Sequence, residues 1–76
     1  MGEIMTLSQR LWQLRLEANL TIKASANAAG LSASYLYDLE NGRTEPSLKA
    51  LRKLSTAYGV TVVELLARVR WESDHE

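Results

Sequence analysis

The sequence contains no cysteine and a single histidine among its 76 residues. Without cysteine, neither a disulfide framework nor a cysteine-ligated zinc site can support the core. The histidine, His75, stands in a charged tail, and a metal site needs several converging ligands. The sequence therefore predicts a protein without a metal or any other cofactor.

Long apolar runs are also missing. No run approaches the roughly 18 residues that a helix needs to span a bilayer, and the first residues lack a signal-peptide pattern. These two absences predict a cytoplasmic protein with no membrane partner. The sequence shows no paired-carboxylate, nucleophile–base or glycine-rich phosphate motif, and a chain this short leaves little room for a substrate cleft. An enzyme is therefore the least favoured class of function.

Charge of one sign is not in excess, because nine basic residues balance nine acidic ones. The distribution is uneven: all nine basic residues lie between Thr6 and Trp71, together with only five of the acidic ones. The body of the chain thus has four more positive than negative charges, and the other acidic residues lie at the two ends. This pattern is compatible with phosphate binding, but it does not identify a nucleic-acid-binding protein by itself.

Helical spacing and capping residues predict three helices in the first half of the chain. Leucines on one face predict a helix from about Thr6 to Ala18. A second is expected from the N-cap Thr21 to Gly30, which suits the left-handed conformation that follows a helix. A third is expected from the N-cap Ser32 to Asn41-Gly42, with Leu36 and Leu39 buried.

Two more helices are predicted after the only proline. Pro46 prevents the third helix from continuing, and Ser47 can cap a fourth that ends at Gly59. Thr61 and Glu64 have capping-box spacing at the start of a fifth. The expected apolar positions are Leu48, Leu51, Leu54 and Ala57 in the fourth helix and Val62, Leu65, Leu66 and Val69 in the fifth. The prediction is a single, compact, all-α domain of five helices, with its core over about residues 6–71 and an acidic tail over 72–76.

The stretch from Thr21 to Leu39 carries the functional signal. A tight turn joins two short helices, with Gly30 at the turn and Leu31 packed beneath it. This arrangement is typical of a helix-turn-helix motif. An ordinary helical hairpin would show the same spacing. The third helix adds a second signal, because its outward face carries short or hydrogen-bonding side chains instead of long charged ones. These residues are Ala33, Ser34, Tyr37 and Asp38.

This outward face suits the major groove of DNA, which is wide enough for a helix. There Ser34 can donate or accept a hydrogen bond, Asp38 can accept from cytosine N4, and Ala33 can touch a thymine methyl group. The Asp38 carboxylate would be repelled by phosphate unless it meets a cytosine amine or a nearby cation.

Many residues between Leu7 and Leu66 match the sequence pattern of one known family at the same spacing. They are Leu11-x-x-Leu14-Arg15, Leu20-Thr21, Ala26, Gly30-Leu31-Ser32, Tyr35-Leu36, Leu39-Glu40-Asn41-Gly42-Arg43, Pro46-Ser47-Leu48, Leu51, Leu54, Gly59-Val60 and Glu64-Leu65-Leu66. With these residues the chain closely resembles the DNA-binding domain of the lambda-repressor and Cro-like, or XRE-type, helix-turn-helix family. The resemblance implies a sequence-specific transcriptional regulator, a repressor that binds a two-fold operator in double-stranded DNA as a homodimer.

The resemblance also implies roles for individual residues. Base edges would be read by Ala33, Ser34, Tyr37 and Asp38. Phosphates would be held by Thr21, Ile22, Lys23, Tyr35, Asn41, Arg43 and Ser47. Arg15 and Glu40 would form a structural ion pair that fixes the first helix against the end of the third. If that pair is buried, losing one partner would cost several kcal/mol.

The sequence departs from the family pattern in three places. Ile22 stands where the family commonly has a glutamine that braces the recognition helix and the DNA backbone. Ser25 stands where a large aliphatic residue is usual, so the helices must pack closely or a neighbour must fill the gap. Trp12 and Leu16 occupy positions that are usually polar. They either fill that gap or form an exposed apolar patch for a protein partner, and we favour the patch.

The fifth helix is the expected dimer contact, because it offers more apolar surface than one face can bury. The candidate dimer residues are Val63, Leu66, Val69 and Trp71. Leu65 and Leu66 are better suited to closing the core, so Val63 and Trp71 are the main partner-facing candidates. An alternative function is a protein-interaction module, antitoxin-like or anti-repressor, that uses the same fold. The apolar patch and the missing glutamine favour that alternative.

Overall fold

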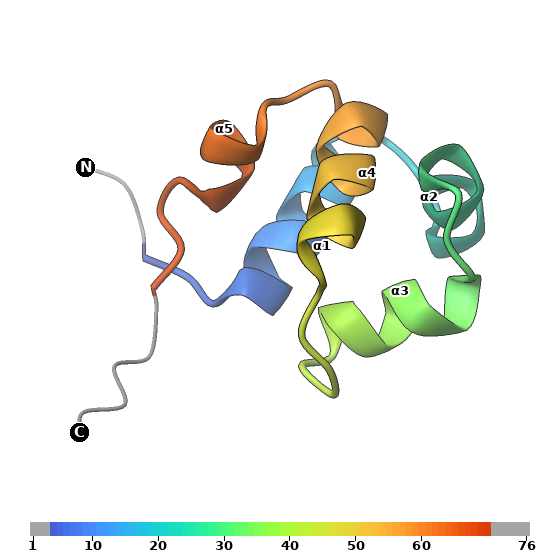
Figure 1. The fold of residues 1–76 in the computed structure, drawn as a ribbon, viewed down its shortest axis with the longest axis horizontal. Coiled ribbons are helices and arrows are strands. Elements are labelled where there is room, and N and C mark those ends of the chain that lie inside the picture. The colour runs from blue at the N-terminus through green and yellow to red at the C-terminus, as the bar shows by residue number, and fades with distance from the viewer. Residues whose placement is uncertain (1–3, 71–76) are drawn as a thin grey trace.

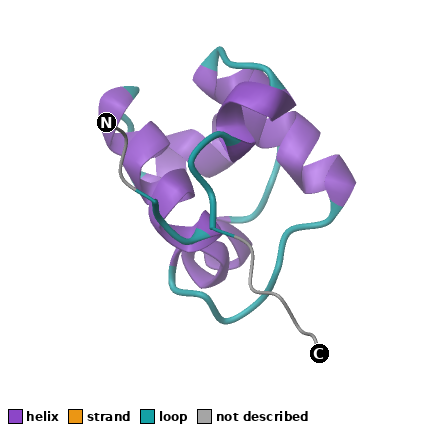
Figure 2. Ribbon diagram, turned by 90° about the vertical axis from the view of Figure 1, so that its left-hand side faces the viewer, coloured by secondary structure: helices purple, strands orange, loops and turns teal. Residues whose placement is uncertain are grey.

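The computed structural model describes residues 4–70, and in this range the chain forms five helices without a β-strand. These helices are α1 (Leu7–Glu17), α2 (Ile22–Ala29), α3 (Ala33–Glu40), α4 (Leu48–Tyr58) and α5 (Val62–Leu66). Short loops join them, and α1 and α4 lie between α5 on one side and α2 and α3 on the other (Figure 1). Figure 2 shows the same all-helical arrangement from the side. The predicted all-α class is confirmed. None of these helices is long and apolar enough to cross a membrane.

A hydroxyl side chain caps the start of each of these helices. Each cap accepts a hydrogen bond from the backbone N–H three residues later. The five caps are Thr6, Thr21, Ser32, Ser47 and Thr61. Gly30 and Gly59 end α2 and α4 in the left-handed conformation, with φ of 70° and 71°. The predicted boundaries are confirmed to within a residue or two, except at the end of α5.

The core is made of leucines from α1, α3, α4 and α5 and of alanines from α2. α2 packs on α3 and α4, while α5 packs on α1 and α4. The buried apolar residues of the core are Leu11, Leu14, Ala26, Ala29, Leu36, Leu39, Leu51, Leu54 and Leu65. Leu36 and Leu39 hold the inner face of α3 against this core. The opposite face of α3 is consequently held toward solvent.

Two apolar positions differ from the prediction. Leu48, expected among the inward residues of α4, is 57% exposed. It lies about a quarter turn from the centre of the buried face, which Ala50, Leu51, Leu54 and Ser55 form. Val69 does not lie on the fifth helix. α5 ends at Leu66, and the next residue, Ala67, has an extended backbone conformation.

The segment after α5 instead pairs with the start of the chain. Met5 N donates to Arg68 O over 3.0 Å, and Arg70 N donates to Met5 O over 2.7 Å. These bonds form a parallel bridge between Met5 and Val69. Arg10 of α1 closes the nearby end of α5, where its guanidinium donates to the carbonyls of Glu64 and Leu65 over 2.6 and 2.9 Å. A cation at the C-terminal end of a helix also interacts favourably with the helix dipole.

Candidate nucleic-acid interface

The outward face of α3 carries the residues predicted to read bases. Ala33, Ser34 and Tyr37 are exposed, and Asp38 is partly exposed. Ser32 begins the helix by accepting from Tyr35 N over 3.1 Å. Because Leu36 and Leu39 are buried on the other side, these side chains project from a rigid, anchored helix.

Arg43 folds back onto this face from the loop after α3. Its Nη1 lies 3.5 Å from Asp38 Oδ1, and its guanidinium carbon lies 5.6 Å from the centre of the Tyr37 ring. Arg43 is therefore the cation that the Asp38 carboxylate was expected to need. The Arg43 and Asp38 side chains are 65% and 41% exposed, so water screens the pair. The guanidinium can accordingly exchange this contact for a phosphate.

Two surface cavities are lined by six of the eleven residues predicted to contact DNA. A cavity of about 390 Å³ is lined in part by Ile22, Tyr37 and Asn41. A second, of about 580 Å³, is lined in part by Thr21, Lys23 and Ala33. The start of α2 and the exposed face of α3 therefore form one continuous surface.

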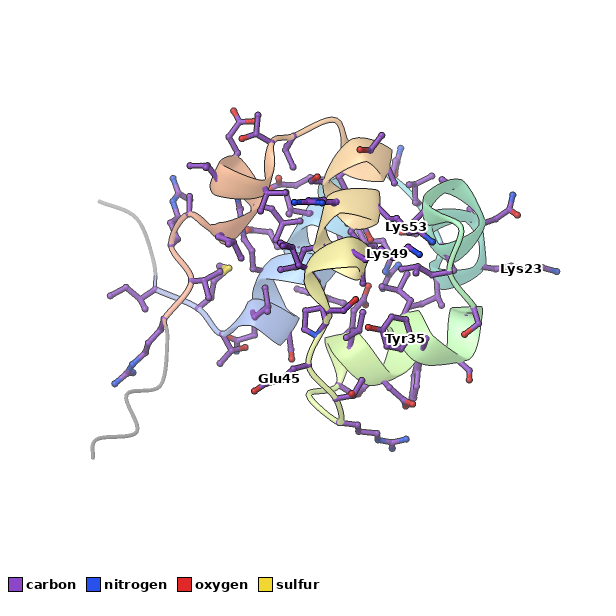
Figure 3. All side chains as sticks on the ribbon, viewed as in Figure 1. Lys23, Tyr35, Glu45, Lys49 and Lys53 are labelled. Atoms are coloured by element: carbon purple, nitrogen blue, oxygen red, sulfur yellow. The ribbon has the colours of Figure 1, made fainter. Side chains whose placement is uncertain are left out.

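At the start of α2, the backbone N–H groups of Ile22 and Lys23 precede the first hydrogen bonds of the helix. Ala24 N donates to Thr21 Oγ1 over 3.1 Å, and Ser25 N donates to Thr21 O over 2.9 Å. The two earlier N–H groups have no such partner within the helix, which suits them to an anion. Figure 3 shows the Lys23 side chain pointing away from the molecule.

Three other residues predicted to contact phosphate lie outside these two cavities. Tyr35 is half-buried against the core and stands on the side of α3 that faces α4 (Figure 3). Arg43 is engaged with Asp38, and Ser47 caps α4 by accepting from Ala50 N over 3.0 Å. Figure 3 also shows Lys49 and Lys53 extending from α4 on the side facing α2. Sequence reasoning counted these two lysines only in the total charge, although their spacing of four places them on one helix face.

The expected ion pair between Arg15 and Glu40 joins α1 to the last residue of α3. Arg15 Nε donates to Glu40 Oε2 over 2.8 Å and Nη2 donates to Oε1 over 3.0 Å. The third nitrogen, Nη1, donates to Leu20 O over 2.9 Å. The two side chains are only 12% and 4% exposed. The hydrogen bonds with Glu40 raise the pKa of Arg15 above its usual value.

The small Ser25 is accommodated by Tyr58 at the end of α4. Ser25 is fully buried, and its hydroxyl lies 2.6 Å from the Tyr58 hydroxyl. Burial raises the pKa of Tyr58. Trp12 and Leu16 do not fill this gap, because about half of each side chain is exposed. Sequence reasoning missed Tyr58, since its position at the end of a helix gave no sign of this contact.

The residues predicted for a dimer contact do not form a single exposed patch in the described chain. Val63 is 81% exposed, whereas Leu66 packs partly buried against the core. Val69 is partly buried beside Met5. Trp71 lies outside the described residues.

Comparison with known proteins gives the same kind of domain. Residues 6–68 match the family model described as a helix-turn-helix domain. The chain is 49% identical to the HTH-type transcriptional regulator DdrOP3 of Deinococcus deserti. The alignment spans 70 residues, which are 92% of this chain and 54% of that protein. The chain is 43% identical over 58 residues, 76% of the chain, to the immunity repressor protein of Bacillus phage phi105, covering 40% of it. The chain thus spans about half the length of these curated relatives.

The fold is also similar to a solved structure that contains DNA. The crystal structure of the master regulator for biofilm formation SinR in complex with DNA matches with a TM-score of 0.76 and 34% sequence identity. The match covers 80% of this chain and 98% of that one.

Proposed function

Because the chain belongs to the helix-turn-helix domain family, in its lambda-repressor and Cro-like branch, we propose that it binds specific sequences in double-stranded DNA and represses transcription. The relatives named as a transcriptional regulator and an immunity repressor support this role. The observation that carries the proposal is the face of α3, where Ala33, Ser34 and Tyr37 are exposed. No described segment covers these three residues.

In this proposal α3 lies in the major groove, and its first turns read the base edges. Ser34 donates to or accepts from a base, and Ala33 approaches a thymine methyl group. Asp38 accepts from a cytosine amine, while Arg43 moves from the carboxylate to a phosphate. A carboxylate without a cytosine partner would be repelled by the DNA backbone. Asp38 therefore disfavours incorrect sequences as well as selecting correct ones.

Phosphate contacts orient α3 in the groove. The free N–H groups at the start of α2, with the Lys23 side chain, hold one backbone position. Asn41, Arg43 and Ser47, in the loop after α3, hold another. Such contacts fix the register of the protein but carry no sequence information by themselves. A protein held in this way blocks a promoter sterically.

We further propose that two copies bind half-sites about one helical turn apart, as is common for this motif. Val63 is the described residue best placed to contact a second copy, because it is the most exposed large apolar side chain of the chain's described part. Leu66 and Val69 are partly buried, so Val63 is the main described residue in this contact. A two-fold pattern in the bound DNA would support the dimer.

Selection of bound duplexes from a random pool tests the proposal most directly. We expect an enriched sequence with two-fold symmetry. Arg43→Gln should then weaken binding to selected and scrambled duplexes alike and reduce the salt dependence by about one unit. Arg68→Gln is the matched control for lost charge, because the segment that follows α5 lies on the opposite side of the molecule from the start of α3 (Figure 1). Tyr37→Ala should instead change which bases are preferred.

Two results would contradict these assignments. If no sequence is enriched and the selected pool binds no better than scrambled DNA at moderate salt, the chain is not a sequence-specific regulator. If Arg43→Gln changes the preferred bases and Tyr37→Ala does not, the two residues have been given the wrong roles.

The second candidate function is a protein-interaction module. The half-exposed Trp12 and Leu16 on α1 favour it, because an apolar patch often marks a contact with another protein. Loss of sequence preference in the duplex selection, together with stable capture of a protein by this patch, would favour this second candidate.

A further inference from the structure

A surface cavity connects α1 with the candidate nucleic-acid interface. It has a volume of about 390 Å³ and lies where α1 meets the start of α2 and the end of α3. The residues that line it are Gln9, Trp12, Arg15, Ile22, Tyr37, Glu40 and Asn41. Three of them, Ile22, Tyr37 and Asn41, are among the DNA contacts proposed above. A DNA strand that touches these residues therefore passes the opening that Trp12 helps to form.

We infer that Trp12 contacts the sugar–phosphate backbone of bound DNA, an inference that rests on the proposed function. The side chain is 51% exposed, so its ring is available to a ligand while α1 holds it in place. The indole N–H only donates hydrogen bonds, and it matches a phosphate oxygen, which accepts them. The ring also offers an apolar surface for the carbon atoms of a deoxyribose.

The charged groups that line this cavity, Arg15 and Glu40, neutralise one another and do not repel an anion. Both carboxylate oxygens of Glu40 accept from Arg15, and the Glu40 side chain is almost fully buried. The cavity thus presents no free carboxylate that would repel a phosphate. Gln9 Oε1 accepts from Thr6 N over 2.9 Å, which leaves the Gln9 amide N–H groups as donors.

The position of Ile22 strengthens the case for Trp12. Ile22 has no polar side-chain atom, so at this edge of the interface α2 supplies only backbone N–H groups. Trp12 brings a side-chain donor to the same cavity. Leu16, the other half-exposed apolar residue of α1, does not line the cavity. The two residues of the apolar patch are therefore separable, and Leu16 provides a matched control.

Fluorescence of Trp12 tests this inference. The chain has two tryptophans, so Trp71→Phe leaves Trp12 as the only reporter. We expect acrylamide to quench Trp12 less when the duplex selected above is bound. Trp12→Ala should weaken the selected and scrambled duplexes alike by about tenfold, comparable to one lost hydrogen bond to a charged group. Trp12→Phe should fall between, since it keeps the ring but loses the donor.

Leu16→Ala should leave DNA affinity unchanged, and circular dichroism would verify that each variant is folded. The quenching measurement does not depend on any substitution of Trp12. The inference is wrong if the protein binds the duplex while Trp12 stays as accessible as in the free chain. It is also wrong if raising the protein concentration without DNA protects Trp12, because a second copy then covers it. If the unsubstituted chain binds no duplex, the proposed function fails and this inference fails with it.

Discussion

The ion pair between Arg15 and Glu40 should be among the most sensitive sites for the stability of the domain. Arg15→Met keeps the length of the side chain but removes the guanidinium and three hydrogen bonds, two to Glu40 and one to Leu20 O. The Glu40 carboxylate would then remain without its partner, in a position where only 4% of its side chain is exposed.

The expected cost follows from this burial. Removing one partner of a buried ion pair costs about 3–5 kcal/mol, because the remaining charge is desolvated without compensation. At about 0.05–0.15 kcal/mol per residue, the free energy of unfolding of this 76-residue chain is about 4–11 kcal/mol. Arg15→Met should therefore remove a large part of the stability and leave a measurable fraction of the chain unfolded.

Urea unfolding followed by far-UV circular dichroism measures the effect. Glu40→Leu should cost a similar amount, because it leaves the Arg15 cation unpaired. The double variant should cost no more than either single one, since replacing both partners of a buried pair with apolar side chains is often close to neutral. Arg52→Met is the matched control, because Arg52 is exposed on α4 and its loss should change stability by less than about 0.5 kcal/mol.

Two results would refute this reasoning. If each single substitution costs less than about 1 kcal/mol, the site behaves as a solvent-exposed pair would. If the cost of the double variant equals the sum of the single costs, Arg15 and Glu40 stabilise the domain independently of one another.

Further predictions concern contacts that hold the helices in place. Tyr58→Phe leaves the buried Ser25 hydroxyl without its partner and should lower the free energy of unfolding by about 1–3 kcal/mol in urea titrations; adding Ser25→Ala should recover part of that loss. Because burial raises the pKa of Tyr58 from 10.0, its contribution to stability is complete below pH 10.0 and is lost as pH rises through the folded value. Tyr58→Phe should therefore flatten the alkaline decline of the urea midpoint, and an unchanged decline would contradict this. Gly30→Ala should cost about 1–2 kcal/mol in thermal unfolding, because φ is +70° although the space around it is open; Gly30→Asn should cost less. Arg10→Met should increase amide hydrogen exchange in α5, and equal exchange would show that its bonds to Glu64 and Leu65 do not hold that helix.

The predictions that succeeded were mostly local in sequence. A hydroxyl cap bonds to a backbone N–H only three residues later, as Thr21 does with Ala24. A glycine such as Gly30 changes the backbone direction at its own position. Such features can be read from neighbouring residues because their partners are near in the chain. The pair of Arg15 and Glu40, which are 25 residues apart, was predicted only through the family resemblance.

The tertiary structure decided what lies at longer range. Tyr58 reaches Ser25 across 33 residues, and Arg10 reaches Leu65 across 55. The same packing ended α5 at Leu66 and paired Val69 with Met5, where helical spacing alone predicted a longer helix. It also placed Trp12 beside Ile22 and Tyr37 in one cavity.

The amino-acid sequence by itself determined where the helices begin and which face of α3 is apolar, because these depend on bonds and spacings within one turn. Only the tertiary structure decided which polar groups meet and which side chains share the outer surface. Those outcomes depend on how helices distant in the sequence pack together, and no local pattern encodes that geometry.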